Sequence, residues 1–194
     1  MSQKNKNLDK LQNILRGPIK GPSAWYGAHI KNSDEWIVTL SSGDVVEIEH
    51  AIQASRSLDI KDISQSDFYL PKFGLKLKEI LDTLLNGRGF VLIRGLPVEG
   101  YTVEDTARAY WGIGRHLGSP RSQNANGDLL GHVIDLSRSA KDPNARIYQT
   151  SARRNYHCDS TDIVGLLCMQ KAMSGGASSI ISSVTLYNEM LQQK

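Results

Sequence analysis

A histidine and an aspartate stand two positions apart at His157 and Asp159, with Cys158 between them. On a β-strand, residues i and i+2 face the same side, so this imidazole and this carboxylate can reach one metal ion. Non-haem Fe(II) oxygenases hold iron with two histidines and one carboxylate on one face, which leaves positions for cosubstrate and O₂. The tripeptide therefore supplies two of three ligands at the spacing that a strand requires.

The same tripeptide has two other interpretations. Short motifs arise by chance, and at a surface strand end His157 would only hydrogen-bond to Asp159. A zinc site from Cys158, Cys168 and histidines is conceivable, but the chain has no Cys-x-x-Cys or His-x-x-x-His pair to support it. On a strand, Cys158 should point away from a metal and fits a small residue that faces the core.

Two amphipathic helices and a strand should precede the motif. Apolar residues at i, i+3, i+4, i+7 and i+8 predict a helix over 77–85 that stops at Asn86-Gly87. Residues 89–95 form a short apolar run bounded by glycines, which is typical of a buried strand. A second helix should begin at Thr102, capped with Asp105, and stop at 118–120. Its expected inward residues are Val103, Ala107, Tyr110, Trp111 and Leu117.

The remaining segments read as an N-terminal arm and a growing sheet. Residues 1–22 form a mildly basic arm, and the β-rich runs 35–40 and 44–48 around Ser41-Ser42-Gly43 predict a hairpin. Four later strands are expected at 130–136, 145–150, 163–169 and 178–184, followed by a short helical pattern over 186–192. The fold class is therefore α+β. A sheet halted after few strands leaves an open edge, which favours self-association.

Bulk composition fits a globular protein and narrows the function classes. The chain has 194 residues, 40% of them hydrophobic, and a net charge of +3, which is too small to indicate nucleic acid. No run approaches the roughly 18 apolar residues of a membrane helix. Two cysteines and a polar start favour a reducing, cytoplasmic setting.

Several segments in order resemble the taurine catabolism dioxygenase (TauD/TfdA) family of Fe(II)/2-oxoglutarate-dependent dioxygenases. Residues 155–160 match its His-Thr/Ser-Asp motif, and 174–178 match the Gly-Gly-x-Thr/Ser turn that follows about two dozen residues later. Residues 87–95 match its entry strand, with the helix over 111–117 and Gly118 after it. The resemblance covers about residues 80–191. It implies a double-stranded β-helix (jelly roll) with flanking helices.

The resemblance also implies roles for single residues. His157 and Asp159 would be iron ligands, and the Ser178 hydroxyl would contact 2-oxoglutarate in place of the family's threonine. Asn155 and Tyr156, next to the first ligand, are the best candidates for contacts to the substrate. Arg153 and Arg154 could meet an anionic substrate or be solvated loop charges, and His132 could line the pocket or be a half-buried histidine. The partners would be O₂ and a small organic, acidic substrate.

The family's distal histidine and its 2-oxoglutarate-binding arginine have no counterpart here. None of the 35 residues after Asp159 is His or Arg, and the other four histidines precede the motif. We therefore expect a mobile arm (1–22), a β-hairpin extension (23–70) and a C-terminally truncated dioxygenase domain (71–194). This chain should be inactive alone; the alternative is a non-catalytic fragment or interaction module with half of the metal site.

Overall fold

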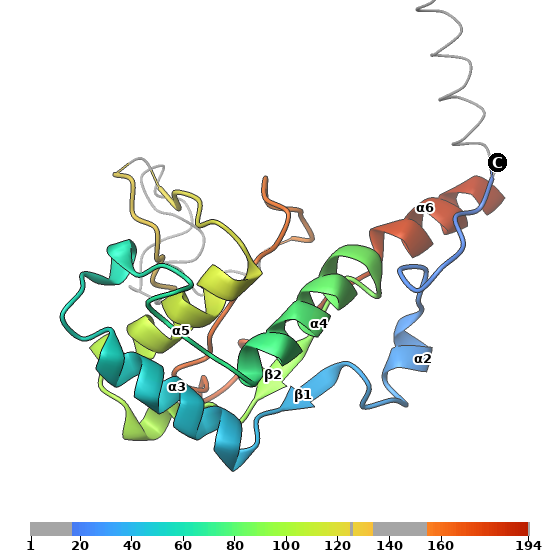
Figure 1. Cartoon of the computed structure of the whole chain (residues 1–194). Coiled ribbons are helices and arrows are strands. Elements are labelled where there is room, and N and C mark those ends of the chain that lie inside the picture. Colours follow the sequence, from blue (N-terminus) through green and yellow to red (C-terminus); the bar gives the residue numbers. More distant parts are fainter. Residues whose placement is uncertain (1–16, 125, 134–154, 194) are drawn as a thin grey trace, which may run out of the picture. The chain divides into compact units, whose positions relative to one another are not determined.

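The computed structural model describes residues 17–124, 126–133 and 155–193, which form helices and a small sheet (Figure 1). The fold class of this part is α+β, as predicted. Along the chain lie α2 (Gly27–Ile30), β1 (Ile37–Thr39), α3 (Ser42–Ala54), η1 (Ile60–Asp62), α4 (Phe73–Asn86), β2 (Leu92–Arg94), η2 (Val98–Gly100), α5 (Val103–Leu117) and α6 (Ser183–Gln192). None of the helices in these ranges is both long and apolar enough to cross a membrane.

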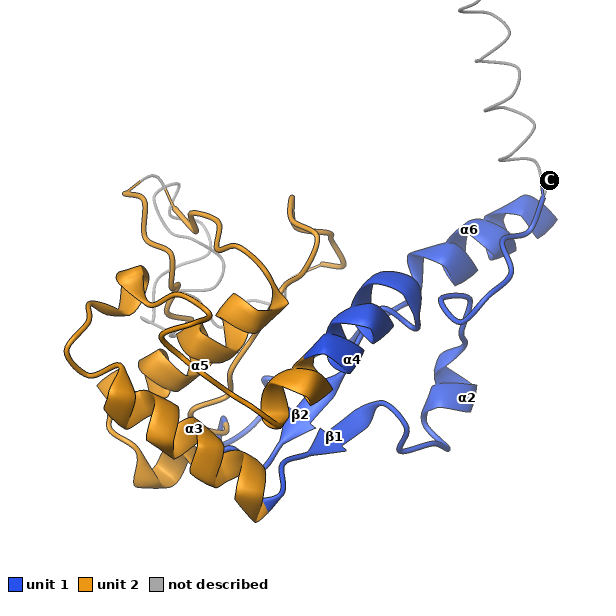
Figure 2. Cartoon of the chain, in the orientation of Figure 1, with its two compact units in different colours: residues 1–41, 78–96, 172–194 blue, residues 42–77, 97–171 orange. Residues whose placement is uncertain are grey.

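The chain divides into two compact units, each assembled from separate stretches of sequence (Figure 2). Unit 1 comprises residues 1–41, 78–96 and 172–194, and unit 2 comprises 42–77 and 97–171. The metal motif at 157–159 lies in unit 2, whereas Ser178 lies in unit 1.

Unit 1 contains the two-stranded sheet. Strands β1 and β2 pair in parallel with Ile37 opposite Leu92, and the Leu92 amide donates to the Trp36 carbonyl at 2.8 Å. Trp25 packs edge-on against Phe90, with ring centroids 5.0 Å apart. Parallel strands need a long connection between them, and here it runs through α3 and α4.

Helix α6 holds the segment that precedes α2. Asn188 bonds the backbone of Ile19 twice, because its Oδ1 accepts from the Ile19 amide and its Nδ2 donates to the Ile19 carbonyl, each at 2.8 Å. The Thr185 hydroxyl donates to the Trp25 carbonyl at 2.7 Å. These side chains make residues 19–25 an ordered part of unit 1.

Unit 2 is built on α3 and α5, which pack against each other. Apolar side chains fill its core, among them Ile48 and Ile52 of α3, Trp111 of α5, and Phe68 from the segment before α4. The Trp111 indole N–H donates to the Ile63 carbonyl at 3.0 Å, so its polar atom is satisfied. Burying an isoleucine or phenylalanine side chain, such as that of Ile48 or Phe68, stabilises the fold by roughly 1.5–3 kcal/mol.

The two helices predicted before the motif are confirmed, but one residue that was predicted to face the core is exposed. Helix α4 spans Phe73–Asn86 and α5 spans Val103–Leu117. The Thr102 side chain accepts from the Asp105 amide as predicted, and Gly118 is the C-terminal cap. Trp111 is buried as expected, but Val103 is 63% exposed because it sits in the first turn, before α5 meets the core. Helix α6 begins earlier than the predicted 186–192 pattern.

The predicted β-hairpin is wrong. Residues 44–48 belong to α3, and β1 pairs instead with β2, which is far along the chain. The buried positions Asp44, Ile48, Ala51 and Ile52 recur at helical spacing and override the β-propensity of the Val45-Val46 pair. The run 89–95 does form a strand, but over 92–94 only, and Leu92 is 36% exposed rather than buried.

The later strands do not form in the described residues. Residues 163–169 and 178–182 are neither helix nor strand, and Ser183–Val184 open α6. Residues 130–133 of the first expected strand are not in a strand either. Three predicted features lie outside the described residues: the rest of that strand, the expected strand at 145–150, and the pair Arg153 and Arg154. A strand needs a partner to satisfy its backbone, and none pairs with 163–169 or 178–182 in the described part.

Candidate metal centre

The His-x-Asp motif lies in an irregular segment rather than a strand. Residues 155–159 have no regular secondary structure, yet the His157 and Asp159 side chains meet: Nε2 lies 3.7 Å from Oδ1. The i, i+2 spacing therefore places the imidazole and the carboxylate side by side without a paired strand, and metal binding by the two stays a prediction.

A local hydrogen bond fixes which imidazole nitrogen is available to a metal. The His157 Nδ1 lies 2.8 Å from the Asn155 carbonyl oxygen, which can only accept, so in the neutral ring Nδ1 carries the proton. The lone pair is then on Nε2, the atom that faces Asp159. Metal-binding histidines are commonly oriented by such a bond from the second ring nitrogen.

Both side chains are open to solvent. The His157 side chain is 40% exposed and that of Asp159 is 46% exposed. Within the ranges that the structure describes, no group of three His, Cys, Asp or Glu side chains could hold a metal ion. The pair therefore offers two donors of a three-donor facial set.

The other predicted site residues divide between the two units. Asn155 and Tyr156 are exposed beside the pair, and Tyr156 is 58% exposed. Asn155 acts on the site through its carbonyl, which orients His157. Ser178 is exposed and belongs to unit 1, whereas the pair belongs to unit 2.

The two cysteines are free thiols at the surface. The expectation that Cys158 faces the core is wrong, because residues 155–162 run along the outside of unit 2 and all of them are exposed. Cys168 donates a weak hydrogen bond to the Gln170 carbonyl at 3.5 Å.

The remaining histidines are outside the centre. His116 is a structural residue, because its Nε2 lies 2.8 Å from the Phe68 carbonyl and its Nδ1 lies 3.3 Å from Gln65 Nε2. A carbonyl oxygen cannot donate, so His116 donates from Nε2 and accepts at Nδ1. His132 is exposed rather than half-buried.

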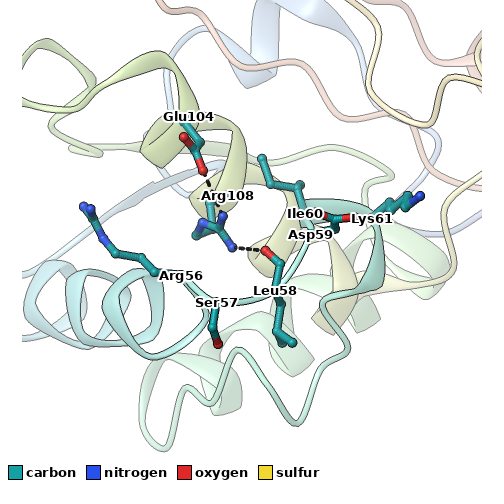
Figure 3. A pocket seen from close by; sticks show the side chains of 8 residues that line it. All are labelled: Arg56, Ser57, Leu58, Asp59, Ile60, Lys61, Glu104 and Arg108. Carbon is teal, nitrogen blue, oxygen red and sulfur yellow. Dashed lines mark hydrogen bonds and ion pairs between the residues drawn. The ribbon is translucent and has the colours of Figure 1, made fainter.

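A second cluster of polar residues surrounds a hollow of about 470 Å³ in unit 2 (Figure 3). Its most buried member is Arg108, which is 2% exposed and points at the turn that follows α3. Arg108 Nη1 donates to the carbonyls of Ser55 (2.5 Å) and Leu58 (3.0 Å), and Nη2 donates to Glu104 at 3.1 Å. These bonds make Arg108 a clamp on residues 55–58.

The sequence contains a signal for the burial of Arg108, which was not among the residues predicted to face the core from α5. It stands four residues after Glu104 and three before Trp111, so the three share one stripe of the helix. An arginine on the stripe of a buried tryptophan is predicted to be buried and paired. Arg56, at the rim of the hollow, pairs with Asp105 through two 3.0 Å bonds.

Comparison with known proteins identifies relatives of this chain and the family to which it belongs. It is 30% identical over 183 residues to FR-33289 synthase of Streptomyces rubellomurinus, covering 93% of this chain and 54% of that protein. It is 29% identical over 189 residues to the taurine hydroxylase-like protein SAT17 of Stachybotrys chartarum, covering 93% of this chain and 49% of that one. The chain thus spans about half the length of the curated relatives it matches. A profile of the taurine catabolism dioxygenase TauD, TfdA family matches residues 55–194, so the chain belongs to this family.

Proposed function

We propose that this chain carries part of the active site of an Fe(II)- and 2-oxoglutarate-dependent dioxygenase that hydroxylates a small organic, acidic substrate. The observation that supports the proposal most directly is the oriented pair: His157 is held through Nδ1, and its Nε2 faces the Asp159 carboxylate at 3.7 Å. An imidazole and a carboxylate are the donors that non-haem iron uses in this class of enzyme.

In this proposal the chain's own residues bind and orient. His157 and Asp159 would hold the metal, which when bound would activate O₂ with 2-oxoglutarate as the cosubstrate that is oxidised to succinate and CO₂. The Ser178 hydroxyl donates to a carboxylate of 2-oxoglutarate, and Asn155 and Tyr156 contact the substrate. The complete domain would be the jelly roll that the family implies, with a cytoplasmic setting as the sequence predicts.

Two donors are too few for a functional iron site, so the 194-residue chain should bind Fe(II) weakly and form no succinate. We expect His157→Ala and Asp159→Ala each to weaken Fe(II) binding by about tenfold or more, by analogy with the loss that even outer residues of metal sites cause. Anaerobic calorimetric titration of Fe(II) into each protein measures this.

Asp162→Ala is the matched control, because Asp162 is an exposed carboxylate of the same segment. Its Fe(II) affinity should equal that of the unmodified chain. Equal Fe(II) affinity in His157→Ala and Asp162→Ala would contradict the proposed metal centre. Steady succinate formation by the 194-residue chain would contradict the prediction that two donors are too few for a functional iron site.

A non-catalytic interaction module is the second candidate. It is favoured by the apolar side chains exposed after the motif in unit 2, such as Val164 at 54% and Leu166 at 76%. Large apolar side chains that gather in one exposed patch mark interaction surfaces. The Fe(II) titration separates the two, because in a module without a metal role His157→Ala leaves the Fe(II) affinity unchanged.

A further inference from the structure

The segment 19–26, which we call the strap, is bound to helix α6 within unit 1 (Figure 2). The Thr185 hydroxyl donates to the Trp25 carbonyl at 2.7 Å, across 160 residues of sequence. Asn188, one turn further along the helix, holds both backbone groups of Ile19 at 2.8 Å. Polar side chains of α6 therefore bind the backbone of the strap at two separate points.

The strap is also bound to the sheet of unit 1. The Trp25 indole N–H donates to the Arg88 carbonyl at 2.9 Å, and its ring packs against Phe90. Both of these residues lie in the segment that leads into β2. The Tyr26 hydroxyl in turn donates to the Glu189 carboxylate on α6. The strap thus joins α6 to the segment before β2.

The first residue of the α6 cap is bound to the strap as well. The Ser182 hydroxyl accepts from the Thr185 amide at 2.9 Å, and it donates to the Ser23 carbonyl. Ser182 is 8% exposed, whereas residues 172–181 before it are all exposed. This exposed segment is therefore anchored to unit 1 at its C-terminal end.

The exposed segment carries Ser178, the residue predicted to contact 2-oxoglutarate. It lies four residues before Ser182, which is a span of at most about 14 Å in a fully extended chain. On the other side of Ser178, Gly175 and Gly176 both have a φ of 71°, which glycine adopts without steric cost. Glycines restrain a backbone little, so the position of Ser178 depends on the anchor at Ser182.

We propose that the strap positions Ser178 for the cosubstrate, and that Thr185 and Asn188 are the positioning residues on α6. The proposal rests on the proposed function, because it requires Ser178 to contact 2-oxoglutarate. A segment that is ordered before binding loses less conformational freedom when the ligand arrives, so the strap raises the affinity without touching the ligand. The family profile begins at residue 55, so the strap lies outside the part of the chain that it matches.

Thr185→Val tests the strap in the full chain, because valine keeps the branched shape and loses the hydroxyl that holds Trp25. Hydrogen–deuterium exchange of the peptide 174–182 measures its order, and equilibrium dialysis with labelled 2-oxoglutarate and excess Fe(II) measures affinity. We expect faster exchange over 174–182 and an affinity lowered by about fivefold, as for the loss of one hydrogen bond. Thr185→Ser keeps a hydroxyl and should restore both.

Ser183→Ala is the matched control, because Ser183 is an exposed serine in the first turn of the same helix. It should change neither the exchange nor the affinity. Circular dichroism checks that each variant is folded at the temperature of the assay. If Thr185→Val does not fold, Asn188→Ala, which removes both bonds to Ile19, carries the same expectation.

Three results would overturn the proposal. A strap that only stabilises the fold would lower the melting temperature of Thr185→Val and leave the 2-oxoglutarate affinity of the folded variant unchanged. Equal effects of Thr185→Val and Ser183→Ala would mean that the bond to the strap is not the cause. A loss of Fe(II) affinity without cosubstrate would indicate general damage, because the metal pair lies in unit 2.

Ser178→Ala in the same dialysis separates this proposal from the proposed function. If Ser178→Ala loses 2-oxoglutarate but a folded Thr185→Val does not, the cosubstrate contact stands and the positioning role of the strap fails. If Ser178→Ala binds like the unmodified chain, the proposed contact of Ser178 fails, and the positioning role fails with it. Exchange over 174–182 then still measures whether the strap holds the segment.

Discussion

At the scale of single residues, Arg108 is a buried polar side chain that contributes to stability. Its guanidinium donates to the carbonyls of Ser55 and Leu58, and the Ser55 carbonyl also accepts from the Leu58 amide at 3.1 Å. The partner Glu104 is 71% exposed, so most of its charge is already solvated. The backbone bonds therefore carry the stabilisation, and the ion pair adds little.

Arg108→Met should lower the free energy of unfolding by about 2 kcal/mol, because it removes the charge-assisted bonds from the buried guanidinium to the Ser55 and Leu58 carbonyls. Glu104→Gln should change it by less than about 1 kcal/mol, as expected for an exposed pair. Urea denaturation of both variants measures the difference. Equal losses would mean that the ion pair, and not the carbonyl clamp, is what the fold needs.

Tyr101 provides a residue-scale prediction on pH. Burial, and then the nearby Glu49 carboxylate, to which the hydroxyl donates at 3.4 Å, raise the pKa of Tyr101 from 10.0 to about 12. The folded protein thus holds this proton longer than the unfolded chain does. Tyr101 therefore adds stability that is complete below pH 10 and is lost as the pH rises from 10 to about 12.

Alkaline titration of tyrosinate absorbance, taken as the difference from Tyr101→Phe, measures this pKa directly. Glu49→Gln should lower it without returning it to 10.0, because burial is the larger cause. The difference spectrum is needed because the pKa values of Tyr26 and Tyr110 are also raised, the first by its bond to Glu189 and the second by burial. A value near 10.0 in the unmodified chain would mean that Tyr101 is solvated.

At the scale of elements, helices were predictable and strand partners were not. The periodicity of 77–85 and the Thr102–Asp105 cap act within a few residues, so sequence alone located α4 and α5. β1 pairs with a strand more than fifty residues away, which no local pattern encodes, and Val45-Val46 favoured the wrong element. The proximity of His157 to Asp159 was predictable for the same reason as the helices, because the two residues are only two positions apart; their binding of a metal stays a prediction.

Helix α5 offers a matched pair of glycines that tests its packing. A Cβ on Gly112 would lie 2.2 Å from the ring of Phe68, which is fully buried and cannot yield, whereas nothing lies within 4 Å of one on Gly114. Gly112→Ala should destabilise by about 2 kcal/mol through overpacking. Gly114→Ala should stabilise by roughly 0.5–1 kcal/mol through helix propensity. Thermal unfolding followed by circular dichroism gives both signs, and a stable Gly112→Ala would contradict the close approach of α5 to Phe68.

At the scale of the whole molecule, the residues predicted for the site are distributed over both compact units. The metal pair lies in unit 2 and Ser178 in unit 1, and each unit is assembled from stretches far apart in sequence. The α+β class could be predicted because it depends only on which elements form. The meeting of Ser178 with a cosubstrate held at the metal pair depends on long-range assembly and stays a prediction. It therefore needs a test in which one hydroxyl is removed and nothing else changes.

Ser178→Ala should weaken 2-oxoglutarate binding in the presence of excess Fe(II) by about tenfold, because a hydrogen bond to a charged group contributes roughly 1.5–3 kcal/mol. Ser178→Thr should bind like the unmodified chain, since threonine keeps the hydroxyl. Ser179→Ala, at the neighbouring exposed position, is the control and should have no effect. Anaerobic equilibrium dialysis with labelled 2-oxoglutarate measures all three. The Fe(II) affinity measured without cosubstrate should be unchanged in all three variants, which separates a cosubstrate contact from damage to the metal pair. If Ser178→Thr loses as much 2-oxoglutarate affinity as Ser178→Ala, the hydroxyl is not what 2-oxoglutarate recognises.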